Sequence, residues 1–168
     1  RGDISRRTAD WGIDGQIVRR HDLATDSGDG ELIRQRATGV DAGSLRSRVL
    51  NDVVQANGTA EHRGEYGNLR LNFAAERKDV DRNDLATVAA AAGSNYAEAA
   101  ALVQTVSFVE SGAELEHPLA ESRSMRLIAL QRLKDDRSRA RSSTLSTNQA
   151  STGNNQSHEY ILRGLLRQ

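Results

Sequence analysis

Residues 68–74, Asn-Leu-Arg-Leu-Asn-Phe-Ala, alternate apolar and polar side chains and give the clearest local signal in the chain. On an extended backbone the two leucines and the phenylalanine fall on one side, and the arginine and second asparagine on the other. The stretch therefore predicts a strand with one buried face.

Towards the N-terminus, residues 1–40 are polar and punctuated by glycine. The pairs Ile17-Val18 and Leu32-Ile33 flank the segment 26–30, Asp-Ser-Gly-Asp-Gly, whose residue types tolerate the positive φ of tight turns. We expect two short strands around a turn, lying beside the strand at 68–74 in a small antiparallel sheet.

Residues 42–56 predict an amphipathic helix instead. Five Leu and Val residues between positions 45 and 54 recur at intervals that place them in one apolar stripe. Asp41 is suited to cap the start of this helix, and Asn57-Gly58 supplies a left-handed stop at its end.

From Asp84 onward the sequence predicts a helical hairpin or bundle. One short helix runs from 85 to 92 and is broken by Gly93, and a second opens at Asn95 and ends at Ser111-Gly112. A third begins with Pro118 in its first turn, where the missing N–H costs nothing, and runs to about position 137.

Residues 85–104 also look like a helix-turn-helix unit, because Ala89 and Gly93 would let two helices cross closely. The helix that would read DNA carries Glu98 and has no Arg or Lys, so it offers nothing to contact bases or phosphates. We therefore favour a helical hairpin that packs within the protein.

The last 27 residues divide in two. Residues 142–157, Ser-Ser-Thr-Leu-Ser-Thr-Asn-Gln-Ala-Ser-Thr-Gly-Asn-Asn-Gln-Ser, are of low complexity and predict a linker. Residues 158–168 predict a C-terminal amphipathic helix with an apolar side formed by Ile161, Leu162, Leu165 and Leu166. The expected fold is thus α+β and mainly helical: a single domain at 1–141, the linker, and a tethered helix.

Composition limits the chemistry. Aromatic residues make up 4% of the 168, so the core must come from aliphatic side chains. The chain has no Cys, which excludes disulfides, thiolate catalysis and cysteine-bound zinc. It has no run of 18 apolar residues, so we predict no transmembrane helix and no membrane partner.

The distribution of charge is more informative than its net value of zero. Residues 79–121 carry one basic and eight acidic residues, and residues 122–168 carry nine basic and three acidic residues. The two segments could attract each other inside one molecule, or steer one copy onto another. A third alternative is that Arg132, Lys134, Arg137, Arg139 and Arg141 hold phosphates of a nucleic acid.

Catalytic and metal-binding patterns are weak. The four histidines are scattered, and the glycines at 28 and 30 lack the Gly-Lys-Ser/Thr of a phosphate-binding loop. We predict no catalytic residues, no metal and no cofactor. An enzyme with a site assembled from dispersed residues remains the third alternative for function.

The sequence therefore predicts a non-enzymatic structural or assembly protein, such as a coat, cement or scaffold subunit of a cytoplasmic assembly or a virion. Segregated charge and the C-terminal arm would drive self-association, so the expected partner is another copy of the chain. A nucleic-acid-associated protein that uses residues 132–141 is the alternative.

Overall fold

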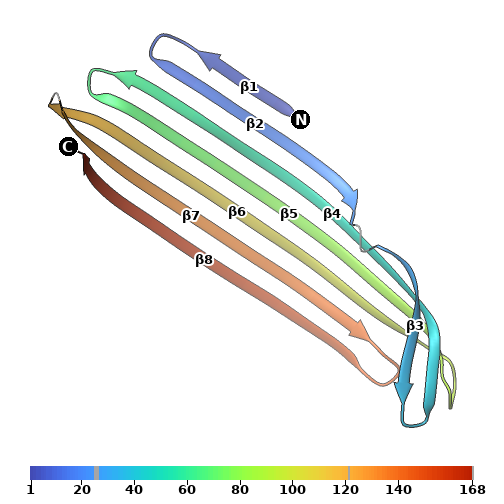
Figure 1. Cartoon of the computed structure of the whole chain (residues 1–168). Helices are drawn as coiled ribbons and strands as arrows, with labels where there is room; N and C mark the ends of the chain where they lie inside the picture. Colours follow the sequence, from blue (N-terminus) through green and yellow to red (C-terminus); the bar gives the residue numbers. More distant parts are fainter. Residues whose placement is uncertain (25–26, 121, 168) are drawn as a thin grey trace.

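The computed structural model describes residues 1–24, 27–120 and 122–167. Within these residues the chain is all-β and forms one open antiparallel sheet without a helix (Figure 1). The mainly helical α+β fold expected from the sequence is therefore wrong. The strands are β1 Gly2–Arg7, β2 Trp11–Leu23, β3 Gly28–Arg36, β4 Gly39–Gly64, β5 Gly67–Ala89, β6 Tyr96–Ala120, β7 Arg123–Ser143 and β8 Asn148–Arg167.

The strands follow one another across the sheet in the order β1-β2-β4-β5-β6-β7-β8, and β3 also pairs with β4. β2 pairs with residues 50–62 of β4, and β3 pairs with residues 39–47 of the same strand, both antiparallel. β2 and β3 therefore lie end to end along one edge of β4, as two halves of an interrupted strand.

Ser27 lies at this interruption, directly before the start of β3. Its hydroxyl accepts a hydrogen bond from the Val49 backbone N–H at 2.7 Å and donates one to the Val49 carbonyl at 3.1 Å. A side chain thus satisfies the backbone groups that a continuous strand would pair. Asp26, the first residue of the predicted turn, lies outside the described residues.

The strand predicted at 68–74 is confirmed and forms the beginning of β5. The apolar pairs at 17–18 and 32–33 also lie in strands, β2 and β3. Their predicted arrangement is wrong, however, because β2 and β3 are aligned end to end and do not pair with each other. β4 separates them from β5.

The helix predicted over 42–56 is wrong, because this stretch lies inside β4. In the strand, the residues of the presumed helical stripe divide between two faces: Val49 and Val53 point one way, and Leu50 and Val54 the other. Branching at Cβ favours an extended backbone for the valines, and pairing on both sides of β4 outweighs the helical spacing.

The predicted helical hairpin or bundle is also wrong. Residues 85–89 end β5, and the second and third predicted helices correspond to β6 and β7. Gly93, with φ of 101°, lies in the connection between β5 and β6, where a left-handed backbone favours glycine. Pro118 lies near the end of β6, beside a register shift, and does not start a helix.

The C-terminal helix predicted at 158–168 is replaced by the second half of β8. Residues 142–143 of the predicted linker end β7, and residues 148–157 form the first half of β8. Between them, the Thr144 backbone N–H donates to the Thr147 carbonyl at 2.9 Å and closes the turn. Backbone pairing with β7 does not require apolar side chains, so this polar stretch can form a strand.

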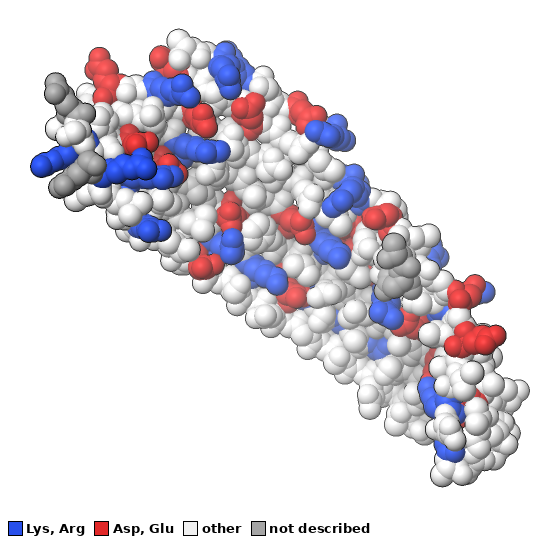
Figure 2. Space-filling model, in the orientation of Figure 1, with Lys and Arg blue, Asp and Glu red and all other residues white. Residues whose placement is uncertain are grey.

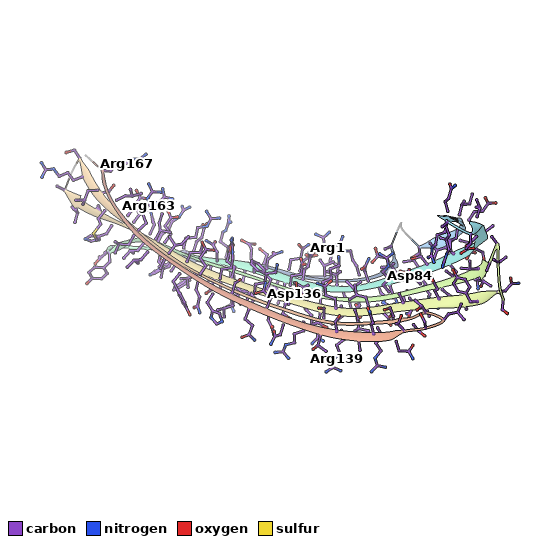
Figure 3. The ribbon with its side chains drawn as sticks, turned by 90° about the horizontal axis from the view of Figure 1, so that it is seen from below. Arg1, Asp84, Asp136, Arg139, Arg163 and Arg167 are labelled. Atoms are coloured by element: carbon purple, nitrogen blue, oxygen red, sulfur yellow. The ribbon has the colours of Figure 1, made fainter. Side chains whose placement is uncertain are left out.

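Side chains stand on both sides of a single bowed layer (Figure 3). We call the side that bears Val49, Val53, Ala86 and Val88 the inner face, and the opposite side the outer face. These four residues are the buried hydrophobic core among the described residues, with exposed fractions between 0 and 9%. The register assigns every other strand residue to a face, because directly paired residues share one.

The core is covered where the β3–β4 hairpin curls over the inner face. The Arg34 guanidinium reaches across β4 and β5 to both carboxylate oxygens of Glu98, at 2.9 and 2.8 Å. Beside it, Arg36 pairs with Asp41 at 2.6 Å and donates to the Tyr96 hydroxyl at 2.6 Å. These contacts hold β3 close to the start of β6, although β3 and β6 are not neighbours in the sheet.

Candidate interaction surfaces

An apolar band crosses the outer face at the end of the sheet that holds the β4–β5 and β6–β7 turns. It occupies residues 2–6, 11–17, 56–62, 69–75, 109–117, 125–133 and 158–166 of the successive strands. Its exposed large side chains are Ile4, Trp11, Ile13, Ile17, Leu71, Phe73, Val109, Leu127, Tyr160, Leu162 and Leu166. Arg6, on the edge strand β1, is the single Asp, Glu, Lys or Arg on the outer face of these segments.

The inner face of the same segments carries all of their Asp, Glu, Lys and Arg side chains except Arg6, together with the apolar Ile128, Leu130, Ile161 and Leu165 of β7 and β8. Side chains that alternate with the apolar band form ion pairs between neighbouring strands: Arg70–Glu61 at 3.5 Å, Arg126–Glu114 at 2.8 Å and Arg132–Glu110 at 2.7 Å. A hydrogen bond from Arg126 lowers the pKa of the Glu114 carboxyl below its ordinary value, so this group stays ionised at neutral pH. At this end of the sheet, the outer face is therefore the more apolar of the two faces, and the inner face is the more charged.

The apolar band ends sharply along the strands. One outward-facing position beyond Ile17 lies Arg19, which contacts Asp52 through two hydrogen bonds at 3.1 and 2.7 Å. At the same level across the outer face are the ion pairs Arg77–Asp79 at 2.9 Å and Arg137–Asp135 at 2.8 Å. At the opposite border, Trp11 stacks on His62 with ring centroids 4.5 Å apart.

The charge difference between segments 79–121 and 122–168 is balanced within the sheet, because the acidic β6 lies beside the basic β7. Glu110 and Glu114 of β6 pair with Arg132 and Arg126 of β7. Figure 2 shows acidic and basic side chains interleaved over the visible face rather than gathered at separate ends. Ion pairs inside one molecule therefore balance part of the charge difference between the two segments.

The basic cluster at 132–141 does not form one surface. Arg132 and Lys134 lie on the inner face, whereas Arg137, Arg139 and Arg141 lie on the outer face, because the side chains alternate along β7. Arg132 also contacts Glu159 at 3.5 Å, in addition to its pair with Glu110. A nucleic acid on either face would meet only part of the cluster.

The apolar residues near the C-terminus divide in the same way. Ile161 and Leu165 lie on the inner face, and Leu162 and Leu166 lie on the outer face within the apolar band. The strand brings them together with β7, not into the single stripe that a helix would present. The sequence signal for the band is weak here, because Ile128 and Leu130 on β7, like Ile161 and Leu165 on β8, place apolar side chains on the inner face as well.

β8 forms one edge of the sheet, and its side away from β7 has no partner among the described residues. Its register with β7 is regular over residues 148–167, and it contains neither Pro nor Lys. Its first ten residues, 148–157, carry no charge. Proteins usually protect an edge strand with Pro, with charged side chains such as Lys, or with a bulge. The edge formed by residues 148–157 has none of these, so it is open to pairing with another strand.

Sites for chemistry are not evident in the described part of the chain. No group of three or more His, Asp or Glu residues there is arranged to hold a metal ion. His62 and His117 instead bond through Nδ1 to the backbone carbonyls of Asp10 and Tyr66, at 3.0 and 2.7 Å. A hollow on the outer face is lined by Arg48, Leu85 and Arg141 among others, and it is open to solvent.

In residues 1–24, 27–120 and 122–167, no helix has the length and apolar character required to cross a membrane. Neither a protein-family model nor a curated protein matches the chain.

Proposed function

We propose that this chain is a non-enzymatic structural protein that assembles with copies of itself through the edge strand β8. The observation that supports this most directly is the 20-residue edge itself, which is regular, free of Pro and Lys, and unpaired on one side among the described residues. This proposal replaces the tethered helix with an edge strand as the element that joins the copies.

The order of residues in the second half of β8 is self-complementary. If two copies of β8 pair antiparallel about Ile161, Glu159 of each copy lies opposite Arg163 of the other on the inner face. On the outer face, Tyr160 of each copy lies opposite Leu162 of the other. The contact is isologous and closes as a dimer with a two-fold axis through the edge.

This register also agrees with the contacts inside one copy. Glu159 lies 3.5 Å from Arg132, so it would be flanked by that residue and by Arg163 of the second copy. Because the axis passes through the apolar band, the bands of the two copies stay level on one outer face. Opposite charges across strands fix the register of the contact more than they increase its affinity.

Charge reversal tests the proposed register. Arg163→Glu places two carboxylates opposite each other at both symmetry-related positions, and sedimentation velocity should show a shift from dimer towards the 18.3 kDa monomer. Adding Glu159→Arg to this variant exchanges the charges and should restore the dimer. Arg20→Glu on β2 changes the net charge equally, far from β8, and should leave the mass unchanged.

A wild-type chain that sediments as a monomer at every concentration would contradict the proposal. So would a dimer that is equally insensitive to Arg163→Glu and to Arg20→Glu, since the edge of β8 would then not form the contact.

A further inference from the structure

We infer that the apolar band of the outer face lies against the hydrocarbon of a lipid bilayer. The inference rests on the proposed function in one respect, because pairing of two β8 strands covers an edge at the level of the band. The argument uses the dimensions of the band, its borders and the contrast between the two faces.

The dimensions of the band fit a bilayer. On β7 it runs from Met125 to Leu133, which at 3.2–3.4 Å per residue is about 27 Å, and on β5 it runs from Leu69 to Ala75, about 20 Å. The hydrocarbon layer of a bilayer is about 30 Å thick, and a tilted strand crosses it with about 9–11 residues. The nine residues of β7 match this requirement.

The shape of the band argues against a second protein as its cover. A protein interface has an apolar centre with a polar rim on all sides. Apart from Arg6 on the edge strand β1, this band has polar borders only along the strand direction, and it continues across the neighbouring strands from Ile4 on β1 to Leu162 on β8. Both of these edge residues are well exposed, at 71% and 84%. A continuous stripe between two polar zones is the form expected for contact with a lipid layer.

The borders support the same conclusion. Charged side chains return at Arg19 and Asp135 beyond one border, and Trp11 stacks on His62 at the other. Trp is enriched where hydrocarbon meets the headgroups, because its ring is apolar while its N–H stays hydrated. The inner face, with its ion pairs between Arg126 and Glu114 and between Arg132 and Glu110, would face water.

Backbone groups at a strand edge are costly in hydrocarbon when they have no hydrogen-bond partner. The proposed β8 pairing would give hydrogen-bond partners to the backbone groups of the β8 edge beside Tyr160 and Leu162. The backbone groups along the short outer edge of β1 would gain no partner from this pairing. The expectation of no membrane partner came from the absence of a long apolar run. Alternation explains that absence, because the apolar residues of the band occupy every second position.

Single-cysteine labelling tests the inference, because the chain has no cysteine of its own. Leu71→Cys reports on the band, Asn72→Cys on the inner face one residue away, and Asn83→Cys on the outer face beyond the band. Each full-length variant carries an environment-sensitive fluorophore and is mixed with phosphatidylcholine vesicles, with and without brominated acyl chains.

The label at position 71 should become several-fold brighter, shift to the blue, and be quenched by brominated lipid. The labels at 72 and 83 should change little. Ala113→Arg, which places a charge in the band, should lower the partition coefficient of the protein into vesicles by roughly 30-fold or more. Ser107→Arg, beyond the border on the same strand and face, is the matched control.

Equal responses at positions 71 and 72 would overturn the inference. A label at 71 that is already shielded without vesicles would also overturn it, because a second copy would then cover the band. In the Arg163→Glu background, a loss of dimer with continued quenching at 71 would separate the two proposals and support lipid contact alone. If the dimer forms while position 71 stays in water, lipid contact is the part that fails.

Discussion

Trp11 of β2 and His62 of β4 stack across neighbouring strands, with ring centroids 4.5 Å apart and ring planes within 4° of parallel. The pair is directly opposed in the register and stands on the outer face, at the end of the apolar band on these two strands. His62 is held from a second side, because its Nδ1 lies 3.0 Å from the Asp10 carbonyl oxygen. The stack therefore joins the β1–β2 turn to β4.

A double-mutant cycle should detect this stack. Trp11→Ala and His62→Ala each remove it, so their effects on the free energy of unfolding should be non-additive by about 0.5–1.5 kcal/mol, the usual range for aromatic pairs. Circular dichroism during chemical denaturation is the measurement, since Trp11 is the sole Trp and its fluorescence is lost in one variant. Strictly additive effects would show that the two rings do not stabilise each other.

Arg34 should control the order of the β3–β4 end. Its guanidinium donates to both oxygens of Glu98, a geometry that Lys cannot reproduce. Arg34→Ala should therefore increase amide hydrogen exchange across residues 28–36, and Arg34→Lys should restore only part of the protection. Exchange in residues 123–133, far from this contact, is the internal control. Unchanged exchange in β3 would mean that strand pairing alone holds the hairpin.

Acid should destabilise the same end of the sheet. The backbone N–H of Ala91 and, after it, the guanidinium of Arg36 lower the pKa of the Asp41 carboxyl below its usual 3.8. A carboxyl with a lowered folded pKa stabilises the protein above its unfolded pKa, and this contribution is lost as the pH falls below about 4. Asp41→Asn should make unfolding midpoints less dependent on pH in that window. An Asp41→Asn variant whose unfolding midpoint depends on pH as strongly as that of the wild type would contradict this account.

Gly67 should tolerate no side chain. It closes the β4–β5 turn with φ of 109°, and a Cβ there would collide with the backbone carbonyl oxygen of Glu116. Gly67→Val should lower the free energy of unfolding by about 1–3 kcal/mol or more, through strain and displacement of β6. Gly30→Ala, where a Cβ meets no atom within 4 Å, should have a much smaller effect in the same denaturation experiment. Equal losses in the two variants would contradict this account.

The strand at 68–74 could be predicted because its alternation is strict and includes Leu and Phe. The helices were predicted because the apolar residues of β4, β6 and β7 also recur at helical spacing. Val49 and Val53, four positions apart, fit a helix face as well as one face of a strand, and only Arg82 and Lys78, their partners on β5, decide between these readings. A single sequence does not reveal which strand will supply the pairing.

The candidate surfaces were partly visible in the sequence. The sequence predicts one helical stripe of Ile161, Leu162, Leu165 and Leu166, whereas the strand places these residues on two faces. The apolar band was missed because each strand contributes only three to five positions to it. It becomes evident when seven segments, far apart in the sequence, are aligned by their hydrogen bonds.

The sequence by itself determined that residues 68–74 have two unlike faces, since their strict alternation of apolar and polar side chains is a property of the chain. It also determined that disulfides and thiolate chemistry are excluded, because the chain has no cysteine. Only the tertiary structure decided that Glu110 meets Arg132 and that Ile17 is level with Val109. The physical reason is that strand pairing joins residues distant in sequence, whereas local periodicity reports only on a residue's near neighbours.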